Sequence, residues 1–408
     1  MVFAIEEINN NPTLLPNITL GFQIYDSCTI LQRALKGALW ILTGQEEPVP
    51  NYRCQRGLPP AAIIGDAGST RSIALARILG LYRYPQISYF STSPLLSDRN
   101  QFPSFFRTIP SDEFQSHGLA QLVMHMGWTW VGILAANNEY GQQGSQIVQR
   151  ELIKAGACVA FTENILLNRV DKNALHIVQV LKNSTAKAIV VFSSNAELVP
   201  LLDEMVRQNI TGKIWIASEA WSTSSLLSIK QYSETLAGTI GFAIHSGEML
   251  SFQENFLHIH PSSSTEDIFM KMFWEKTFNC QWMNQENLLK IKDNVTKMCT
   301  GNEQLDSLRI DSMMDFRITY NIYNAVYATV LALKDLRLCL QDGGLFIQGT
   351  CAHISNFYPW QRLLVADSSP LNRCRAKPSP VVGCEPRSDP KVLQDRSAKV
   401  AVPSDLID

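Results

Sequence analysis

The fold is decided by a short apolar run, Trp130-Val131-Gly132-Ile133-Leu134-Ala135, which has the length of a strand. A helical pattern follows from Gly141 to Ala155 and stops at Gly156, a residue type that often ends helices. Similar apolar runs occur at residues 61–64, 86–90, 158–161, 187–192 and 213–217. Continuous apolar strands that alternate with helices are typical of parallel sheets covered on both faces. We therefore predict an α/β fold with doubly wound parallel sheets.

Length and composition narrow the class of protein. A chain of 408 residues suits two domains of common size, and hydrophobic residues make up 46% of it. The formal net charge is -2 and no basic stretch stands out, so we do not expect nucleic-acid binding. No apolar run reaches the roughly 18–20 residues that a membrane span needs.

The cysteines and glycosylation sequons indicate an oxidising, secretory compartment. Nine cysteines occur without a Cys-x-x-Cys motif, which argues against a zinc ribbon or a thioredoxin-type site. Two pairs are close enough in sequence to form short disulfide loops, Cys280 with Cys299 and Cys339 with Cys351, although buried free thiols remain the alternative. N-glycosylation is predicted at four Asn-x-Ser/Thr sequons: Asn17, Asn183, Asn209 and Asn294.

The loops that follow the predicted strands are the candidate ligand site, because doubly wound sheets bind ligands beyond the carboxyl ends of their strands. The strand that ends at Ile64 leads into small residues up to Thr70, where free N–H groups and the Ser69 hydroxyl suit a carboxylate. The simpler alternative is that Ser69 only caps the next helix. The following strand leads into Phe90-Ser91-Thr92-Ser93-Pro94, another loop with hydroxyls and free backbone groups.

Three further residues near strand ends suit an amine. Tyr140 follows a predicted strand and can offer its ring face to a cation. Glu219 can accept hydrogen bonds from an ammonium group, although a lone Glu is more often a solvated loop residue. Asp112 begins the segment that crosses to a second lobe, where it either faces the cleft or acts only as a first-turn helix charge. Together with the hydroxyl loops, these residues complement an α-amino acid zwitterion.

Catalytic and metal-binding signals are weak. The chain lacks HExxH, GxSxG and P-loop motifs, since Gly212-Lys213 is followed by Ile214 rather than Ser or Thr. His258 and His260 form the one close histidine pair, and a solvated surface accounts for them better than a metal site. The sequence therefore predicts a binding protein with no metal site and no enzymatic activity.

Longer motifs carry a family resemblance. Residues 1–9 read Met-Val-Phe-Ala-Ile-Glu-Glu-Ile-Asn, residues 101–110 read Gln-Phe-Pro-Ser-Phe-Phe-Arg-Thr-Ile-Pro, and residues 209–221 read Asn-Ile-Thr-Gly-Lys-Ile-Trp-Ile-Ala-Ser-Glu-Ala-Trp. Shorter matches are Trp130-Val131-Gly132 and Thr239-Ile240-Gly241-Phe242. These motifs resemble the extracellular ligand-binding domain of class C G-protein-coupled receptors. The resemblance spans about residues 1 to 362; within the class it is strongest to vomeronasal type-2 receptors, followed by calcium-sensing receptors.

This resemblance implies a bilobed Venus-flytrap module of the periplasmic-binding-protein type I fold. Residues 1–110 would belong to lobe 1, residues 111–245 to lobe 2, and residues 246–364 to a return to lobe 1. The expected ligand is an amino acid or a peptide, whose binding closes the lobes of a pheromone receptor at the extracellular side of the plasma membrane. The expected partners are a second receptor chain, joined through lobe 1, and a G protein, joined through a seven-helix domain. No cofactor is expected, with calcium a candidate modulator.

The resemblance also implies roles for the cleft residues. The implied ligand contacts are Ser69, Phe90, Thr92, Asp112, Tyr140 and Glu219. Ser69 and Thr92 would meet the carboxylate and ammonium groups, and Asp112 would be an acidic residue of the cleft. Phe90 departs from the calcium-sensing pattern, which has a small residue there, and its ring would narrow the pocket or exclude some ligands.

The same resemblance sorts the cysteines. It implies two internal disulfides, Cys280–Cys299 and Cys339–Cys351. Cys28 would pair with a cysteine upstream of the chain, Cys158 would pair with a cysteine-rich domain, and Cys54 would link dimer partners. Cys374 and Cys384 have no counterpart in the family pattern.

Two parts of the chain depart from this pattern. The first strand of lobe 1 and a signal peptide are missing, which would leave a sheet edge open. Residues 365–408 leave the pattern as well, and their Pro-, Ser- and Lys/Arg-rich composition predicts a disordered tail. We hypothesise an incomplete gene model or a truncated transcript. The alternative function of such a chain is a soluble or retained decoy that binds ligand or dimerises without signalling.

Overall fold

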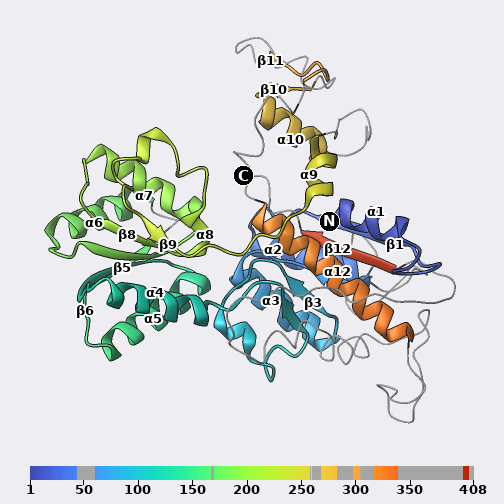
Figure 1. Ribbon diagram of the computed structural model, residues 1–408, viewed down its shortest axis with the longest axis horizontal. Coiled ribbons are helices and arrows are strands. Elements are labelled where there is room, and N and C mark those ends of the chain that lie inside the picture. The colour runs from blue at the N-terminus through green and yellow to red at the C-terminus, as the bar shows by residue number, and fades with distance from the viewer. Residues whose placement is uncertain are drawn as a thin grey trace. The chain divides into compact units, whose positions relative to one another are not determined.

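The computed structural model describes residues 1–43, 60–166, 170–257, 259, 268–282, 297–303, 305, 316–338 and 398–403. The chain forms two compact units (Figure 1). One contains Met1–Ser246 and Phe316–Asp405, and the other contains Gly247–Asp315 and Leu406–Asp408. Within the described ranges, no helix has both the length and the hydropathy that crossing a membrane requires.

The apolar run at residues 130–135 lies in a central strand of a five-stranded sheet in the first unit. In spatial order the strands are β6 (Cys158–Ile165), β5 (Trp130–Ala136), β7 (Ala188–Phe192), β8 (Ile214–Ala217) and β9 (Ile240–Gly241). Every pairing between them is parallel. The predicted α/β class with parallel sheets is confirmed.

Helices cover both faces of this sheet, as Figure 1 shows. They are α4 (Asp112–His125), α5 (Glu139–Lys154), α6 (Val170–Asn183) and α7 (Asn195–Arg207). Successive side chains of β7 point to opposite faces: Ile189 and Val191 pack with α6 and α7, whereas Ala188, Val190 and Phe192 pack with α4 and α5. Because both faces are buried, β7 appears in the sequence as a continuous apolar run.

The other five-stranded sheet of this unit is also parallel throughout. Its spatial order is β1 (Leu20–Tyr25), β12 (Ala398–Pro403), β2 (Pro60–Ile64), β3 (Gln86–Ser88) and β4 (Phe105–Arg107). Its helices are α1 (Val2–Asn10), α2 (Leu31–Thr43), α3 (Ser69–Leu81) and α12 (Arg317–Leu338). Ala62 and Ile64 pack with α1 and α12, whereas Ile63 packs with α2 and α3. Short elements of the unit are α8 (Glu219–Ser222) and the 3-10 turns Pro94–Ser97 and Lys230–Tyr232.

β12 differs from what the sequence predicts. The composition of residues 365–408 predicts a disordered tail, and the sequence also predicts an open sheet edge in lobe 1. Instead, Ala398–Pro403 forms a strand between β1 and β2. The pairing joins segments at opposite ends of the chain, so local composition carries no signal for it. Residues 365–397 and 404–408 lie outside the described residues.

Residues 246–364, for which the sequence predicts a return to lobe 1, are divided between the two units. α12 packs on the first sheet beside α1, where the Tyr323 hydroxyl donates a hydrogen bond to Glu7 Oε2 at 2.9 Å. Residues 247–315 belong to the second unit. A disulfide between Cys280 and Cys299 joins two of its described segments. Residues 339–364 lie outside the described residues.

The second unit contains α9 (Leu250–Leu257), α10 (Ile268–Phe278), β10 (Cys280–Gln281) and β11 (Lys297–Met298). A disulfide joins Cys280 to Cys299, with 5.0 Å between the Cα atoms, which is the pairing that the resemblance implies. In the first unit, Cys28 and Cys158 are exposed and outside any disulfide. The remaining cysteines lie outside the described residues: Cys54, Cys339, Cys351, Cys374 and Cys384.

Three of the predicted glycosylation sites are exposed: Asn17, Asn183 and Asn209. Exposure is necessary for an attached oligosaccharide, which must remain in solvent. Asn294 lies outside the described residues. Glycosylation at these sequons stays a prediction.

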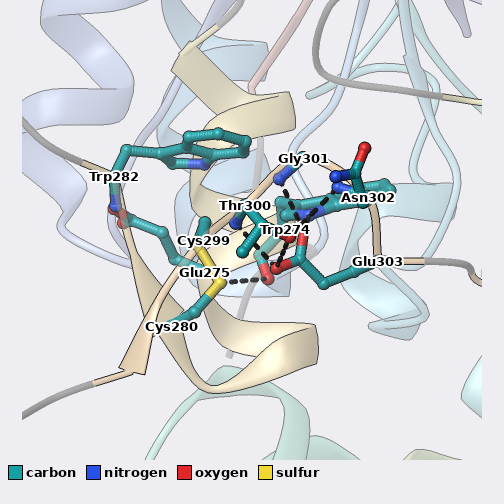
Figure 2. The surroundings of a disulfide bond; sticks show 9 residues. All are labelled: Trp274, Glu275, Cys280, Trp282, Cys299, Thr300, Gly301, Asn302 and Glu303. Carbon is teal, nitrogen blue, oxygen red and sulfur yellow. Dashed lines mark hydrogen bonds between the residues drawn. A yellow bond between two sulfur atoms is a disulfide. The ribbon is translucent and has the colours of Figure 1, made fainter.

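One carboxylate ties the segment after the disulfide to α10, as Figure 2 shows. Glu303 Oε2 accepts hydrogen bonds from Trp274 Nε1 at 3.0 Å and from the Gly301 N–H at 2.8 Å. Its Oε1 accepts from the N–H and the hydroxyl of Thr300 at 2.8 and 2.9 Å. Burial alone would raise the pKa of Glu303, but these hydrogen bonds to the ionised form lower it to about 2.

We expect Glu303→Ala to destabilise the second unit. The substitution leaves the indole N–H of the buried Trp274 without its acceptor, which costs about 1–3 kcal/mol for one buried donor. Amide hydrogen exchange in α10 should accelerate, and exchange in β5 of the first unit should not change. The matched control is Asn302→Ala, at an exposed position in the same turn. Equal exchange rates in the two variants would contradict the role assigned to Glu303.

Candidate ligand-binding site

The loop between β2 and α3 is held in place by the buried residue Asp66. Its Oδ1 accepts hydrogen bonds from the Gly68 N–H and from Arg71 Nε, both at 2.8 Å. Its carbonyl oxygen accepts from the hydroxyls of Ser88 and Ser91 at 2.7 and 2.9 Å. The start of α3 therefore has a fixed position at the carboxyl edge of the first sheet.

Ser69 is the buried first residue of α3. The N-cap position belongs to Gly68, so Ser69 does not have the capping role that the sequence left open. Its Oγ accepts the N–H of Ser93 at 3.2 Å, which brings the loop after β3 against the N-terminus of α3. The Ser93 hydroxyl is buried and has no hydrogen-bond partner among the described residues. Two hydroxyls at a helix N-terminus favour an anionic group.

The loop after β3 holds Thr92 and Phe90 in different surroundings. Thr92 is buried, and its Oγ1 donates to Asp112 Oδ2 at 2.7 Å. Phe90 is half-buried and packs with Ala67 against the core of the first sheet. Thr92 therefore takes part in a polar network, and Phe90 belongs to an apolar wall in the same loop.

Asp112 lies in the first turn of α4. Ser111 is the N-cap, and its Oγ accepts the Glu113 N–H at 3.3 Å. The position fits the simpler expectation of a first-turn charge, but Asp112 is buried rather than solvated. Its N–H donates to the Thr92 carbonyl at 2.8 Å, and its Oδ1 accepts from Gln115 Nε2 at 2.9 Å. Asp112 therefore fixes the start of α4 to the loop of the first sheet.

Tyr140 and Glu219 lie in the first turns of α5 and α8, the helices that follow β5 and β8 of the second sheet. The Tyr140 hydroxyl lies 2.7 Å from Ser218 Oγ and 3.1 Å from Glu219 Oε2. The Tyr140 ring packs against Phe192, with 5.5 Å between the ring centroids. The alternative of a solvated loop carboxylate is wrong for Glu219, because this residue is buried.

One hydrogen-bonded chain links these side chains across the two sheets. Gln115 donates to Asp112 through Nε2 and accepts the Glu219 N–H through Oε1 at 2.7 Å. The chain therefore runs from Thr92 through Asp112, Gln115 and Glu219 to Tyr140. It includes four of the six predicted contact residues, and Gln115 is its central member.

The other predicted residues lie beside this chain. Ser69 adjoins it through Ser93, and Phe90 stays in the apolar wall. Sequence reasoning missed Gln115 and Ser218. Gln115 is placed three residues after Asp112, on the same side of a helix, and Ser218 directly precedes Glu219, but neither spacing is distinctive enough to single out a residue.

The two carboxylates of this hydrogen-bonded chain, Asp112 and Glu219, are difficult to ionise together. Burial raises the pKa of Asp112 well above its ordinary value, and the charge of Glu219 raises it further. The hydrogen bond from Thr92 and the positive charge of Arg107 lower this pKa, but they do not offset the increase. Burial raises the pKa of Glu219 to about 7. Burial and the two acids also raise the pKa of Tyr140, so its hydroxyl stays protonated and can donate.

One carboxylate oxygen of this hydrogen-bonded chain has no hydrogen-bond partner among the described residues. Glu219 Oε1 is buried and makes no hydrogen bond within the part of the chain that the structure describes. A buried carboxylate in this position must take up a proton or meet a cation. In the same described ranges, no group of three acidic, His or Cys side chains could hold a metal ion. The arrangement suits an ammonium group, which can donate to both carboxylates.

A family model and the similar proteins both point to receptors. A family model described as the receptor family ligand binding region matches residues 1–366. The chain is 41% identical to the extracellular calcium-sensing receptor of Homo sapiens over 388 residues, and 40% identical to that of Mus musculus over 389 residues. It is 31% identical to taste receptor type 1 member 2 of Gorilla gorilla gorilla over 377 residues. These matches cover 89% of this chain, but only 36% of each calcium-sensing receptor and 41% of the taste receptor.

We expect Glu219 to make the unliganded protein less stable as the pH rises from about 4.5 to about 7. In the unfolded chain this carboxyl ionises near pH 4.5, whereas in the folded protein burial delays its ionisation to about pH 7. Stability that is present below pH 4.5 is therefore lost across this window, by at most about 3.5 kcal/mol at about 1.4 kcal/mol per pH unit.

Chemical denaturation at a series of pH values measures this effect. Glu219→Gln removes the titrating group and should flatten the profile between pH 4.5 and 7. The control is Glu113→Gln, at an exposed position in the first turn of α4, which should keep the wild-type slope. The same slope in both variants would show that Glu219 does not titrate in this range.

Proposed function

The chain belongs to the receptor family ligand binding region, as the ligand-binding domain of a class C G-protein-coupled receptor and not an enzyme, and on this premise we propose that it binds an α-amino acid or a small peptide. The observation that carries the proposal is the hydrogen-bonded chain from Thr92 to Tyr140. It places two buried carboxylates next to hydroxyl groups and a helix N-terminus, which together complement a zwitterion.

The ammonium end of the ligand would meet Asp112 and Glu219. Gln115 connects the Asp112 carboxylate to the backbone N–H of Glu219, and Glu219 Oε1 has unused acceptor capacity among the described residues. A bound ammonium group would let both acids ionise, because its charge offsets their mutual repulsion and part of their desolvation. Tyr140, which keeps its proton, would hold the Glu219 side chain in the orientation that faces the ligand.

The carboxylate end would meet the N-terminus of α3. Ser69 and Ser93 supply hydroxyls there, and the backbone N–H groups of a first helical turn attract anions. Thr92 lies between the two ends, since it is next to Ser93 in sequence and its hydroxyl contacts Asp112. Opposite charges on neighbouring groups of the ligand fit this arrangement, as in an α-amino acid.

In a receptor, the ligand would bridge two lobes. We assign residues 1–110 and α12 to lobe 1, and residues 111–245 to lobe 2. The proposed contacts come from both, with Thr92 in the first and Glu219 in the second. A ligand that satisfies groups of both lobes favours their closed arrangement over an open one. We propose that this closure, in a dimer joined through lobe 1, signals to a G protein from the extracellular side of the plasma membrane.

The receptor subtype and the role of calcium are finer parts of this proposal. The resemblance to vomeronasal type-2 receptors supports a pheromone receptor, while the relatives reported above are calcium-sensing and taste receptors. The calcium-sensing relatives motivate calcium as a modulator of this chain. A change in amino-acid affinity on adding calcium would support that role, and an unchanged affinity would exclude it.

We expect free L-amino acids to raise the melting temperature of the full chain, because a ligand that binds only the folded state stabilises it. Ser69→Ala and Glu219→Gln should remove this shift, and the surface control Glu113→Gln should retain it. Affinity should also fall about tenfold per pH unit below pH 7, since the ligand must displace the proton of Glu219. A folded wild-type protein that shows no shift with any amino acid or short peptide would refute the proposal.

We expect Phe90→Ala to change which amino acids bind. Removing the ring leaves more space beside Thr92 for the side chain of the ligand. Binding of amino acids with large side chains should therefore improve about tenfold or more relative to that of alanine. Isothermal titration with alanine and tryptophan measures the ratio. Phe114→Ala, at an exposed aromatic position in α4, is the control. An unchanged ratio in Phe90→Ala would exclude Phe90 as a determinant of specificity.

A further inference from the structure

β1 depends on β12 for its strand pairing. Among the described residues, β1 lies at the edge of the first sheet and has β12 as its neighbouring strand. The whole of β1 is in parallel register with β12, from Leu20 opposite Ala398 to Tyr25 opposite Pro403. On its other side, β12 pairs in parallel with β2. β12 therefore fills a slot between two strands, β1 and β2, that are not neighbours of each other.

Both edges of this slot are anchored by other elements. Asn9 of α1 holds β1, since its Nδ2 donates to the Leu20 carbonyl at 3.0 Å and its Oδ1 accepts the Leu20 N–H at 2.8 Å. Gly37 of α2 lies so near β1 that a Cβ at this position would be 3.2 Å from Tyr25 Cβ. β2 is paired in register with β3 on its far side. These contacts hold the two edges in addition to their pairing with β12.

An unoccupied slot would be costly. β2 is buried along its whole length, so its backbone N–H and C=O groups could not all turn to water if β12 were removed. β1 would lose its ladder partner as well. Open strand edges of this kind recruit extended segments by strand addition, in which the backbone supplies most of the affinity.

We propose that the slot between β1 and β2 is a strand-acceptor site, and that its ligand is an extended segment running parallel to both strands, with residues 398–403 of this chain as the resident occupant. The occupant reads Ala-Lys-Val-Ala-Val-Pro. Its valines favour strands, and its proline stands at the last position, where a missing N–H is tolerated. Because each edge also has anchors outside β12, we expect that the occupant can be exchanged while α1, α2 and β3 remain in place.

Hydrogen exchange on the full chain with Ala401→Pro tests the proposal. Proline removes one N–H from the middle of β12 and obstructs pairing in a central strand. Amides of β1 should exchange at least about tenfold faster than in the wild type, while those of β5 and β7 in the other sheet keep their rates. Ser404→Pro, one position beyond β12, should behave as the wild type. Unchanged β1 exchange in Ala401→Pro would overturn the proposal.

Two further measurements complete the test. A synthetic peptide of residues 396–405 in excess should restore β1 protection in Ala401→Pro, and a folded variant that shows no restoration would overturn the acceptor site. If Ala401→Pro fails to fold, the full chain with Phe22→Cys and Val400→Cys decides, since these positions are opposite each other in the register. A disulfide mapped between positions 22 and 400 by mass spectrometry supports the slot, and its absence under oxidising conditions overturns it.

Discussion

Parallel strand pairing is the constraint on which the rest of this structure depends. Every pairing in the two five-stranded sheets is parallel, so each connection must cross over, and the crossing helices cover both faces. The carboxyl ends of neighbouring strands then meet at one edge of a sheet. This is why Ser69, which follows β2, contacts Ser93, which follows β3, across a sequence separation of 24 residues. The same rule brings Tyr140 and Glu219 together in the second sheet.

The site at these edges is electrostatically incomplete. Two buried carboxylates disfavour folding when both are ionised, and the structure compensates for them only in part. The negative charge of Asp112 is stabilised by its position at the N-terminus of α4. Gln115 connects this residue to the backbone of Glu219. The missing contribution is a positive charge next to Glu219. The feature that weakens the unliganded protein near neutral pH is therefore the feature that a cationic group would neutralise. Under the proposed function, this cost in stability would be the basis of the affinity.

Local sequence patterns predict the helices and strands whose formation depends on residues that are close in the sequence. Ala188–Phe192 forms a strand buried on both faces, and such strands are recognisable from their apolar residues alone. The burial of Glu219 could not be predicted, because it arises from α4 and α5 packing around it, and a lone Glu in a loop is usually solvated. Gln115 was missed because an amide on a helix has no distinctive pattern. Ala398–Pro403 was missed because its partners are hundreds of residues away, and β1 because its alternation of buried and exposed positions is weak.

The two halves of the proposed ligand site rest on different sheets, and β2 connects one of them to the slot that β12 fills. Ile63 of β2 is opposite Ala401 of β12, and Ile64 leads directly into the loop that positions Ser69. Displacement of β12 would therefore act first on the carboxylate end of the site. The ammonium end depends on α4, α5 and α8, and it shares no strand with β12. Under the proposed function a zwitterion uses both ends, so its binding would require that a strand between β1 and β2 close the first sheet.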